Sequence, residues 1–103
     1  MSTGINVIDY SVLTVGTTTK DLSSTACSPV LPGKANRMFV TSETAACRWR
    51  ADGTSPTGTE GHTLAKDDSI SFTGANYRQL LEKIEFITDG TSAAASLKIT
   101  WFD

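Results

Sequence analysis

"IEFITDGTSAAASLKITWF", residues 84–102, carries the clearest structural signal in this chain. Its candidate inward-facing side chains recur at every second position in two runs: Ile84, Phe86 and Thr88, then Leu97, Ile99 and Trp101. In a β-strand, successive side chains point to opposite faces, so residues two positions apart share a face. The Asp-Gly-Thr-Ser segment between the runs supplies turn residues. The stretch therefore predicts a β-hairpin with one buried face, whose last strand is integral to the sheet.

The same period of two recurs upstream, and it predicts a larger all-β core. Thr and Ser make up about a quarter of the chain, and strong helix formers never dominate a window long enough for a stable helix. We expect a single antiparallel β-sandwich or jelly-roll-like barrel of about seven or eight short strands. The predicted core consists of Ile8, Tyr10, Val12, Met38, Val40, Trp49, Ile70, Phe72, Ile84, Phe86, Leu97, Ile99 and Trp101.

Three segments depart from regular strand patterning. Residues 76–81 have apolar positions at helical spacing behind Asn76, a possible cap, and predict a short helical turn. Residues 16–36 contain two prolines and two glycines and predict a loop with one short edge strand near 18–22. No linker divides the chain, so residues 1–103 are expected to form one β domain, with 1–6 as a flexible or partner-pairing arm.

Composition excludes several classes of protein. The chain has 103 residues, 39% of them hydrophobic and 19% charged, which is typical of a folded soluble domain and not of a disordered chain or a membrane span. Its first residues lack the basic and apolar regions of a secretory signal, so the protein is expected to be made in the cytoplasm and not to be secreted through a signal peptide. A net charge of -2 argues against binding to nucleic acid, which requires clustered cations.

Cys27 and Cys47 are the only two cysteines. They lack CxxC or Cys/His spacing, so a metal site built on sulfur is not expected. We expect two reduced, buried thiols. A disulfide is the alternative, and it would require secretion or exposure after assembly into an extracellular particle.

The sequence predicts no catalytic residue, no metal and no cofactor. His62 is the only histidine, and no GxSxG or Walker motif is present. Asp67 and Asp68 are adjacent before a strand, so they would point to opposite faces. Glu60 and Asp52 could join them around calcium, but the spacing does not match an EF-hand, and solvated turn residues are the favoured interpretation.

"CRWRADGTSPTGTEGHTLAKDD", residues 47–68, contains the most unusual composition. Trp49 between Arg48 and Arg50 suggests base stacking with phosphate contacts. Strand alternation instead places Trp49 on the face opposite both arginines, which favours a buried indole and two solvent-facing cations. The polar segment 52–61 is expected to be a long, conformationally soft excursion that orders against a partner.

The order "RWRADGTSPTGTEGHTLAKDDSISF" followed by "LEKIEFITDGTSAAASLKITWF" resembles small β-rich structural proteins in the virions of tailed bacteriophages. The resemblance covers residues 45–102 as a series of short turn and strand motifs. It implies a protein that decorates or cements the head at junctions between shell subunits, with the major capsid protein or another virion protein as partner. It also implies a homo-oligomer, most often a trimer. Tail or collar components are the alternative within this class.

Two surfaces are candidates for contact with such a partner: the 52–61 excursion with its preceding arginines, and the N-terminal segment. The predicted contact residues are Arg48, Arg50, Asp52, Gly53, Thr54, Pro56, Thr57, Glu60, Ile5 and Asn6. For each arginine the competing interpretation is an intramolecular pair with Asp67, Asp68 or Glu85. The competing function is a carbohydrate-binding or receptor-binding sandwich with Trp49, Trp101 or Tyr77 as a stacking platform.

Overall fold

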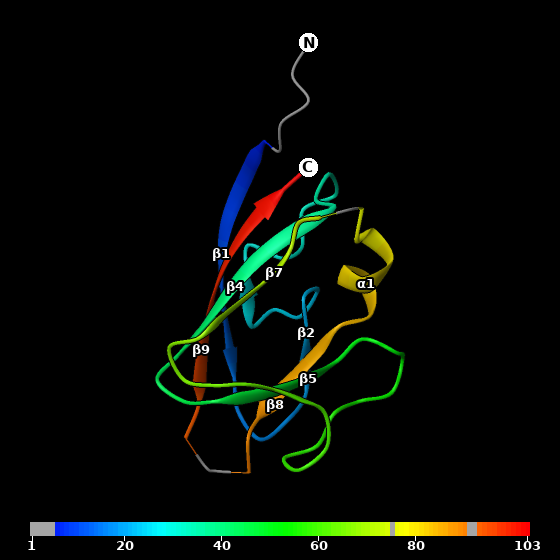
Figure 1. Cartoon of the computed structure of the whole chain (residues 1–103). Coiled ribbons are helices and arrows are strands. Elements are labelled where there is room, and N and C mark those ends of the chain that lie inside the picture. The colour runs from blue at the N-terminus through cyan, green and yellow to red at the C-terminus, as the bar shows by residue number, and fades with distance from the viewer. Residues whose placement is uncertain (1–5, 75, 91–92) are drawn as a thin grey trace.

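The computed structural model describes residues 6–74, 76–90 and 93–103, which form two antiparallel β-sheets packed face to face (Figure 1). The first sheet has the strand order β3-β1-β9-β4-β7, and the second has the order β2-β8-β5-β6. The expected all-β fold is confirmed, with nine strands within these described ranges. Their bounds are β1 (Val7–Val15), β2 (Lys20–Asp21), β3 (Cys27–Ser28), β4 (Arg37–Glu43), β5 (Cys47–Arg50), β6 (His62–Leu64), β7 (Ser69–Phe72), β8 (Glu85–Thr88) and β9 (Ala95–Phe102).

The last strand, β9, is the central strand of the first sheet. It pairs along its length with β1 on one side and with β4 on the other. Its inward side chains Leu97, Ile99 and Trp101 have no exposed surface. The C-terminal strand is therefore integral to the sheet, as its alternation predicts.

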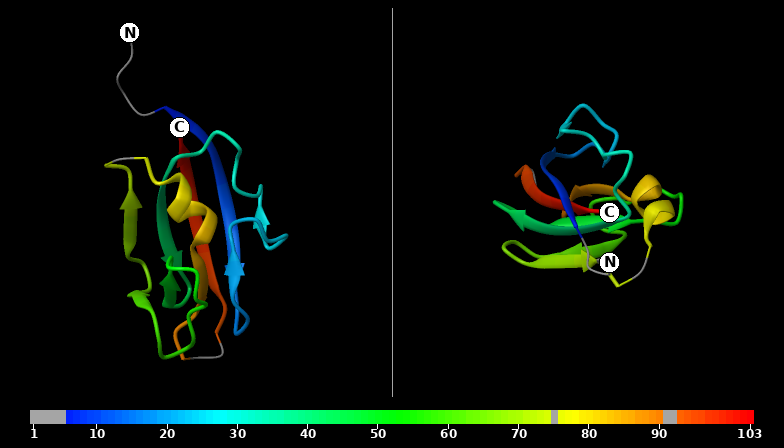
Figure 2. Two further views of the ribbon diagram at one scale, coloured as in Figure 1. Left: turned by 90° about the vertical axis from the view of Figure 1, so that its right-hand side faces the viewer. Right: turned by 90° about the horizontal axis from the view of Figure 1, so that it is seen from above.

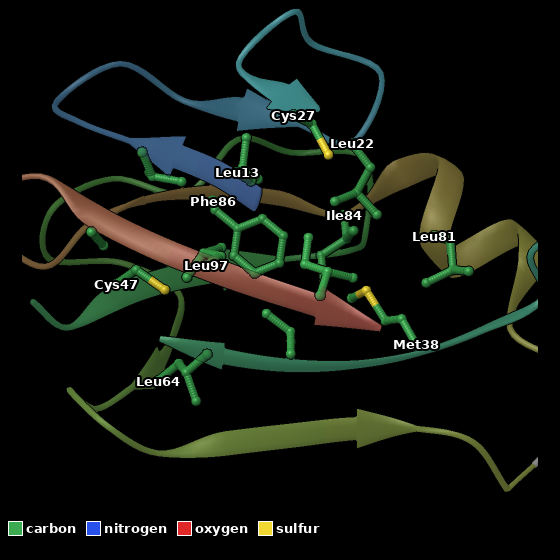
Figure 3. Close-up of a cluster of buried hydrophobic side chains, with 14 of the residues drawn as sticks. Leu13, Leu22, Cys27, Met38, Cys47, Leu64, Leu81, Ile84, Phe86 and Leu97 are labelled. Carbon is green, nitrogen blue, oxygen red and sulfur yellow. The ribbon is translucent and has the colours of Figure 1, made fainter. Parts of the chain in front are cut away.

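The predicted hairpin between residues 84 and 102 is wrong. β8 pairs with β2 and β5 in the second sheet, whereas β9 lies in the first, so the chain crosses from one sheet to the other between them. Phe86 and Leu97 therefore point into the interior from opposite sheets, instead of lying side by side on one sheet (Figure 3). A period of two indicates one buried face but does not indicate which strand supplies the hydrogen bonds. Part of the expected turn, residues 91–92, lies outside the described residues.

The predicted inward face of β1 is also wrong for Tyr10, which is 52% exposed. Ile8 and Val12 are half-buried, and the fully buried positions are Ser11, Leu13 and Val15. A register shift lies near the start of the strand, between residues 7 and 9. Trp101 explains why a serine occupies an inward position, because its indole N–H donates a 2.6 Å hydrogen bond to Ser11 Oγ. A buried indole needs such an acceptor.

The rest of the predicted core lies between the sheets. Trp49, Ile70 and Phe72 are half-buried and pack against the core. The fully buried predicted positions are Met38, Val40, Ile84, Phe86, Leu97, Ile99 and Trp101. Figure 3 shows that Leu22, Leu64 and Leu81, which the period of two did not reveal, complete the same cluster.

Both cysteines are free and buried in this core. Burial raises the pKa of the Cys27 thiol and of the Cys47 thiol to about 11. A buried thiol cannot ionise without losing the hydration of its anion. These thiols are therefore protonated at neutral pH and behave as small apolar side chains.

The helical segment, α1 (Arg78–Lys83), begins two residues later than predicted. Asn76 Oδ1 accepts a 2.9 Å hydrogen bond from the Arg78 backbone N–H, and Leu81 is buried against the core. The Arg78 side chain donates to the carbonyls of Pro32 and Ala35, at 2.7 and 2.8 Å. α1 therefore fixes the 32–35 loop at the end of the sandwich where the C-terminus lies (Figure 2). No helix in the described ranges is long and apolar enough to cross a membrane.

Candidate functional site

Four rings form a continuous row on one side of the sandwich, which we call the aromatic strip: His62, Trp49, Phe72 and Tyr77. Successive ring centroids are 4.5, 5.5 and 5.6 Å apart. The strip joins the second sheet, through β5 and β6, to β7 of the first sheet and to the residue before α1. His62 is exposed and the other three rings are half-buried, so the strip packs against the core and also reaches the surface.

Trp49 has its position because of the register of β5. It pairs directly with Phe86 on one side and with His62 on the other. Directly opposed residues in an antiparallel pair share a face, so Trp49 points to the same side as the buried Phe86. Its predicted inward direction is therefore correct, but β5 ends one residue later at Arg50, and the indole is left at the margin of the core.

Beside Trp49 lies a surface depression of about 480 Å³. Its lining combines aromatic, charged and backbone groups: Trp49, Arg50, Ala51, Asp52, Glu60, Gly61 and His62. The polar members come from the end of β5, from the two ends of the 52–61 loop and from His62 at the start of β6; the loop lies beside the second sheet and is drawn in green (Figure 1). The β5–β6 pairing thus brings together residues 49–52 and 60–62, which have seven residues between them in the sequence.

A bidentate ion pair forms one wall of the depression. Arg50 Nε and Nη2 lie 3.1 and 2.5 Å from the two carboxylate oxygens of Asp52. The hydrogen bonds from Arg50 lower the pKa of Asp52 to about 2, and the same bonds raise the pKa of Arg50. Both groups are therefore charged at physiological pH. Their two parallel hydrogen bonds fix the orientation of the guanidinium group relative to the carboxylate.

Arg48 is also paired within the chain. Its Nε lies 2.6 Å from Asp89 Oδ1, and its Nη1 donates a 3.1 Å hydrogen bond to the Gly61 carbonyl. Intramolecular pairing was the competing interpretation for both arginines, but the acceptors are Asp89 and Asp52 and not the predicted Asp67, Asp68 or Glu85. The carboxylate of Glu85 instead accepts a 2.7 Å hydrogen bond from Ser55.

The 52–61 loop is folded back on the sheet instead of extending away from it. Pro56 is buried, and Thr57 and Glu60 exchange two backbone hydrogen bonds. Gly61 has φ 133°, and a Cβ there would lie 3.0 Å from the Trp49 carbonyl oxygen, so only glycine fits this close approach. These contacts give the 52–61 loop a defined shape against the sheet. The exposed predicted contact residues in it are Asp52, Gly53, Thr54, Thr57 and Glu60.

Of the two N-terminal candidates, the structure describes Asn6, which is separated from this site. Ile5 lies outside the described residues. Asn6 is exposed and bonded to the C-terminal residue: its N–H and Nδ2 donate to the Asp103 carboxylate at 3.2 and 3.3 Å, and its carbonyl accepts from the Asp103 N–H at 3.1 Å. The structure thus ties Asn6 to the end of β9 and places it away from the 52–61 loop (Figure 1).

A second surface lies on the outer face of the first sheet, and sequence reasoning missed it. The register aligns Tyr10, Thr100, Phe39 and Ser71 across β1, β9, β4 and β7, and we call this line the outer row. Tyr10 is 52% exposed and Phe39 is 41% exposed. The available signal was Phe39, a large aromatic at an outward position between the inward Met38 and Val40. The wrong phase of β1 hid its neighbour Tyr10.

In the described ranges, no three His, Cys, Asp or Glu side chains lie close enough together to hold a metal ion. The carboxylates weighed as calcium ligands, Asp52, Glu60, Asp67 and Asp68, form no such group. Comparison of the chain with protein-family models, with curated proteins and with solved structures found no match. Two surfaces of the described residues bring partly or largely exposed aromatic side chains together: the aromatic strip with its depression, and the outer row.

Proposed function

We propose that this chain is a non-enzymatic structural protein of a tailed-phage particle, which decorates or cements the capsid by binding shell subunits through the outer row. The observation that carries the proposal is the pair of exposed aromatics, Tyr10 and Phe39, in one line across the outer face of the first sheet. Exposed apolar groups that gather on one face are typical of interaction surfaces. The motifs of residues 45–102 supply the resemblance to virion proteins.

The size of the face favours a repeated shell as the partner. The eight residues of β9 span about 27 Å, and four strands about 4.8 Å apart give a width of about 19 Å. The face therefore covers on the order of 500 Å². A stable interface between two proteins buries about 800 Å² on each partner, so one such face gives weak attachment and is too small for a stable dimer.

A shell compensates for weak single contacts by multiplicity. It presents many identical subunit junctions, and an oligomer of this chain, such as the trimer that the resemblance implies, engages several of them together. The charges around the face are mixed, with Lys98 4.0 Å from Glu43, so attachment does not depend on one strongly charged partner. Tail and collar subunits offer similar repetition and are the alternative partner of the same class.

The test uses empty shells assembled from the major capsid protein of the phage proposed to carry this chain. We expect the wild-type protein to co-sediment with these shells and to raise their disruption temperature. The variant Tyr10→Thr/Phe39→Thr keeps residues that suit strands and removes the aromatic surface, so it should lose binding while retaining its unfolding transition. The control Thr54→Ala/Thr57→Ala alters the exposed loop and should bind normally. Absence of the protein from purified virions, or full binding by the double Thr variant, would overturn the proposal.

A further inference from the structure

We propose that the depression beside Trp49 is a binding site for neutral saccharides, separate from the attachment through the outer row. A pyranose ring has one face of C–H groups that packs on an indole, while its hydroxyls reach outward to polar groups. The depression offers that combination, because Trp49 and His62 supply rings and Arg50, Asp52 and Glu60 supply charged hydrogen-bonding groups. Its volume of about 480 Å³ lies within the range of small-molecule sites.

The charge of the lining selects a sugar over a nucleotide. Arg50 is neutralised by its bidentate pair with Asp52, and Glu60 adds a further negative charge to the lining. The three charged groups therefore sum to -1. A phosphate would be repelled by this balance, whereas a base-stacking site for nucleic acid needs cations free to meet the backbone. Base stacking on Trp49, the first alternative that its two arginines suggest, is thereby disfavoured.

The polar groups still have capacity for a ligand. Each carboxylate oxygen can accept two hydrogen bonds, and Asp52 Oδ2 accepts one, from Arg50 Nη2, in the described part of the chain. Across residues 6–74, 76–90 and 93–103, the Glu60 carboxylate accepts no hydrogen bond. Hydroxyl groups of a saccharide are donors that match these acceptors.

The site is already shaped before a ligand arrives. The Gly61 carbonyl is held by Arg48, and the paired backbone bonds of Thr57 and Glu60 close the loop that carries Glu60. The Arg50–Asp52 pair fixes the opposite wall. A preformed site loses less entropy on binding than a loop that must order, so a modest number of contacts suffices.

The experiment is a fluorescence titration of the full chain with methyl glucoside, lactose and chitobiose, together with an array of neutral and acidic glycans. Trp49 is the half-exposed tryptophan and Trp101 has no exposed surface, so a ligand in the depression changes mainly the Trp49 emission. We expect saturable binding by at least one neutral saccharide below about 10 mM, a range in which a Kd of about 1 mM is measurable. AMP and single-stranded DNA should not compete.

Variants separate the site from the fold. Trp49→Ala, measured by calorimetry, should reduce affinity by at least about tenfold, and Glu60→Gln by about three- to tenfold through one weakened charged hydrogen bond. Glu60 is exposed, so its variant keeps the test valid if Trp49→Ala fails to fold. The matched control Phe39→Thr removes an exposed aromatic elsewhere and should bind the sugar unchanged.

Three outcomes would overturn the saccharide site: no neutral glycan binds the wild-type chain, AMP or single-stranded DNA competes, or Glu60→Gln binds as wild type. Failure here is distinguishable from failure of the proposed function. Glu60→Gln should still bind shells, whereas the Tyr10→Thr/Phe39→Thr variant should lose shells and keep the sugar.

Discussion

The two tryptophans of this chain occupy contrasting regions. Trp101 lies on the central strand of the first sheet, has no exposed surface and donates its indole N–H to Ser11. Trp49 lies one residue from the end of its strand, is half-buried and has its neighbours His62 and Phe72 near the surface. Each tryptophan is the second-last residue of its strand, but β1 and β4 both extend beyond Trp101, whereas β6 begins at His62, the residue that pairs with Trp49. Long neighbouring strands therefore bury one indole completely, whereas the short neighbour β6 leaves part of the other exposed.

The largest expected difference between the two regions is in the stability lost when the tryptophan is replaced by alanine. Trp101→Ala should lower the free energy of unfolding by about 3–5 kcal/mol, because it opens a cavity in a closed core and leaves Ser11 without its donor. Trp49→Ala should cost clearly less, since part of its surface is already in water. Urea unfolding of both variants measures the difference, and equal losses would break the distinction between the two regions.

The Trp101 region should also depend on one hydroxyl. Ser11→Ala should lower the free energy of unfolding by about 1–3 kcal/mol, because the buried indole N–H and the Pro29 carbonyl, 2.6 Å from Ser11 Oγ, both lose a partner. The matched control is Ser71→Ala, which removes an exposed serine from the outer face of the same sheet and should change stability by less than about 0.5 kcal/mol. Equal losses of stability for the two variants would contradict the explanation that Ser11 faces inward because it accepts the hydrogen bond from Trp101.

The Trp49 region should depend on a backbone conformation instead. Gly61→Ala places a Cβ at a residue with φ 133° and 3.0 Å from the Trp49 carbonyl, which should cost about 1–3 kcal/mol and distort the depression. Gly33→Ala is the control, because a Cβ there meets no atom within 4 Å. Differential scanning calorimetry compares the two, and a Gly61→Ala variant as stable as Gly33→Ala would show that the loop is not held as described.

A pH-dependent effect concerns the two thiols, one near each tryptophan region. Burial raises the pKa of Cys27, whose thiol is hydrogen-bonded to Ser11, and of Cys47 on β5, each from 9.0 to about 11. The folded chain therefore keeps protons that the unfolded chain releases, so this contribution to stability is complete below about pH 9 and is lost as the pH rises to about 11. Unfolding measured from pH 8 to 11 should show this decline, and the variant Cys27→Ala/Cys47→Ala should show a weaker one. An equal decline in that variant would contradict the assignment.

The sequence predicts burial well and strand partnership poorly. The alternation at 97–101 correctly identifies the last strand as central to the fold, and Met38 and Val40 are inward as expected. The pairing of β8 and β9 could not be derived, because a hairpin and a crossover between two sheets give the same period of two. The phase of β1 was misjudged because Ser11, a polar residue, is the inward one, and its partner Trp101 is ninety positions away.

The candidate site was only partly predictable for a related reason. The alternation correctly sets the direction of Trp49, but not its place at the margin of the core, which depends on the neighbouring strand β6 beginning at His62. The partner of Arg48 was missed because Asp89 comes close to it only through the β5–β8 pairing. The partner of Arg50 was missed because Asp52, two residues later, reaches it only through the geometry of the turn after β5. The outer row depends on the registers of three strand pairs, and no local sequence pattern specifies these registers.

The orientation of the sandwich on a phage particle tests this account most sharply. A cryo-EM reconstruction of virions that contain the chain should show it on the outside of the shell at junctions between capsid subunits. The account predicts that Tyr10 and Phe39 face the shell and that Trp49, with its depression, remains in contact with solvent. A particle without this chain, or a sandwich attached with Tyr10 and Phe39 in solvent, would contradict it.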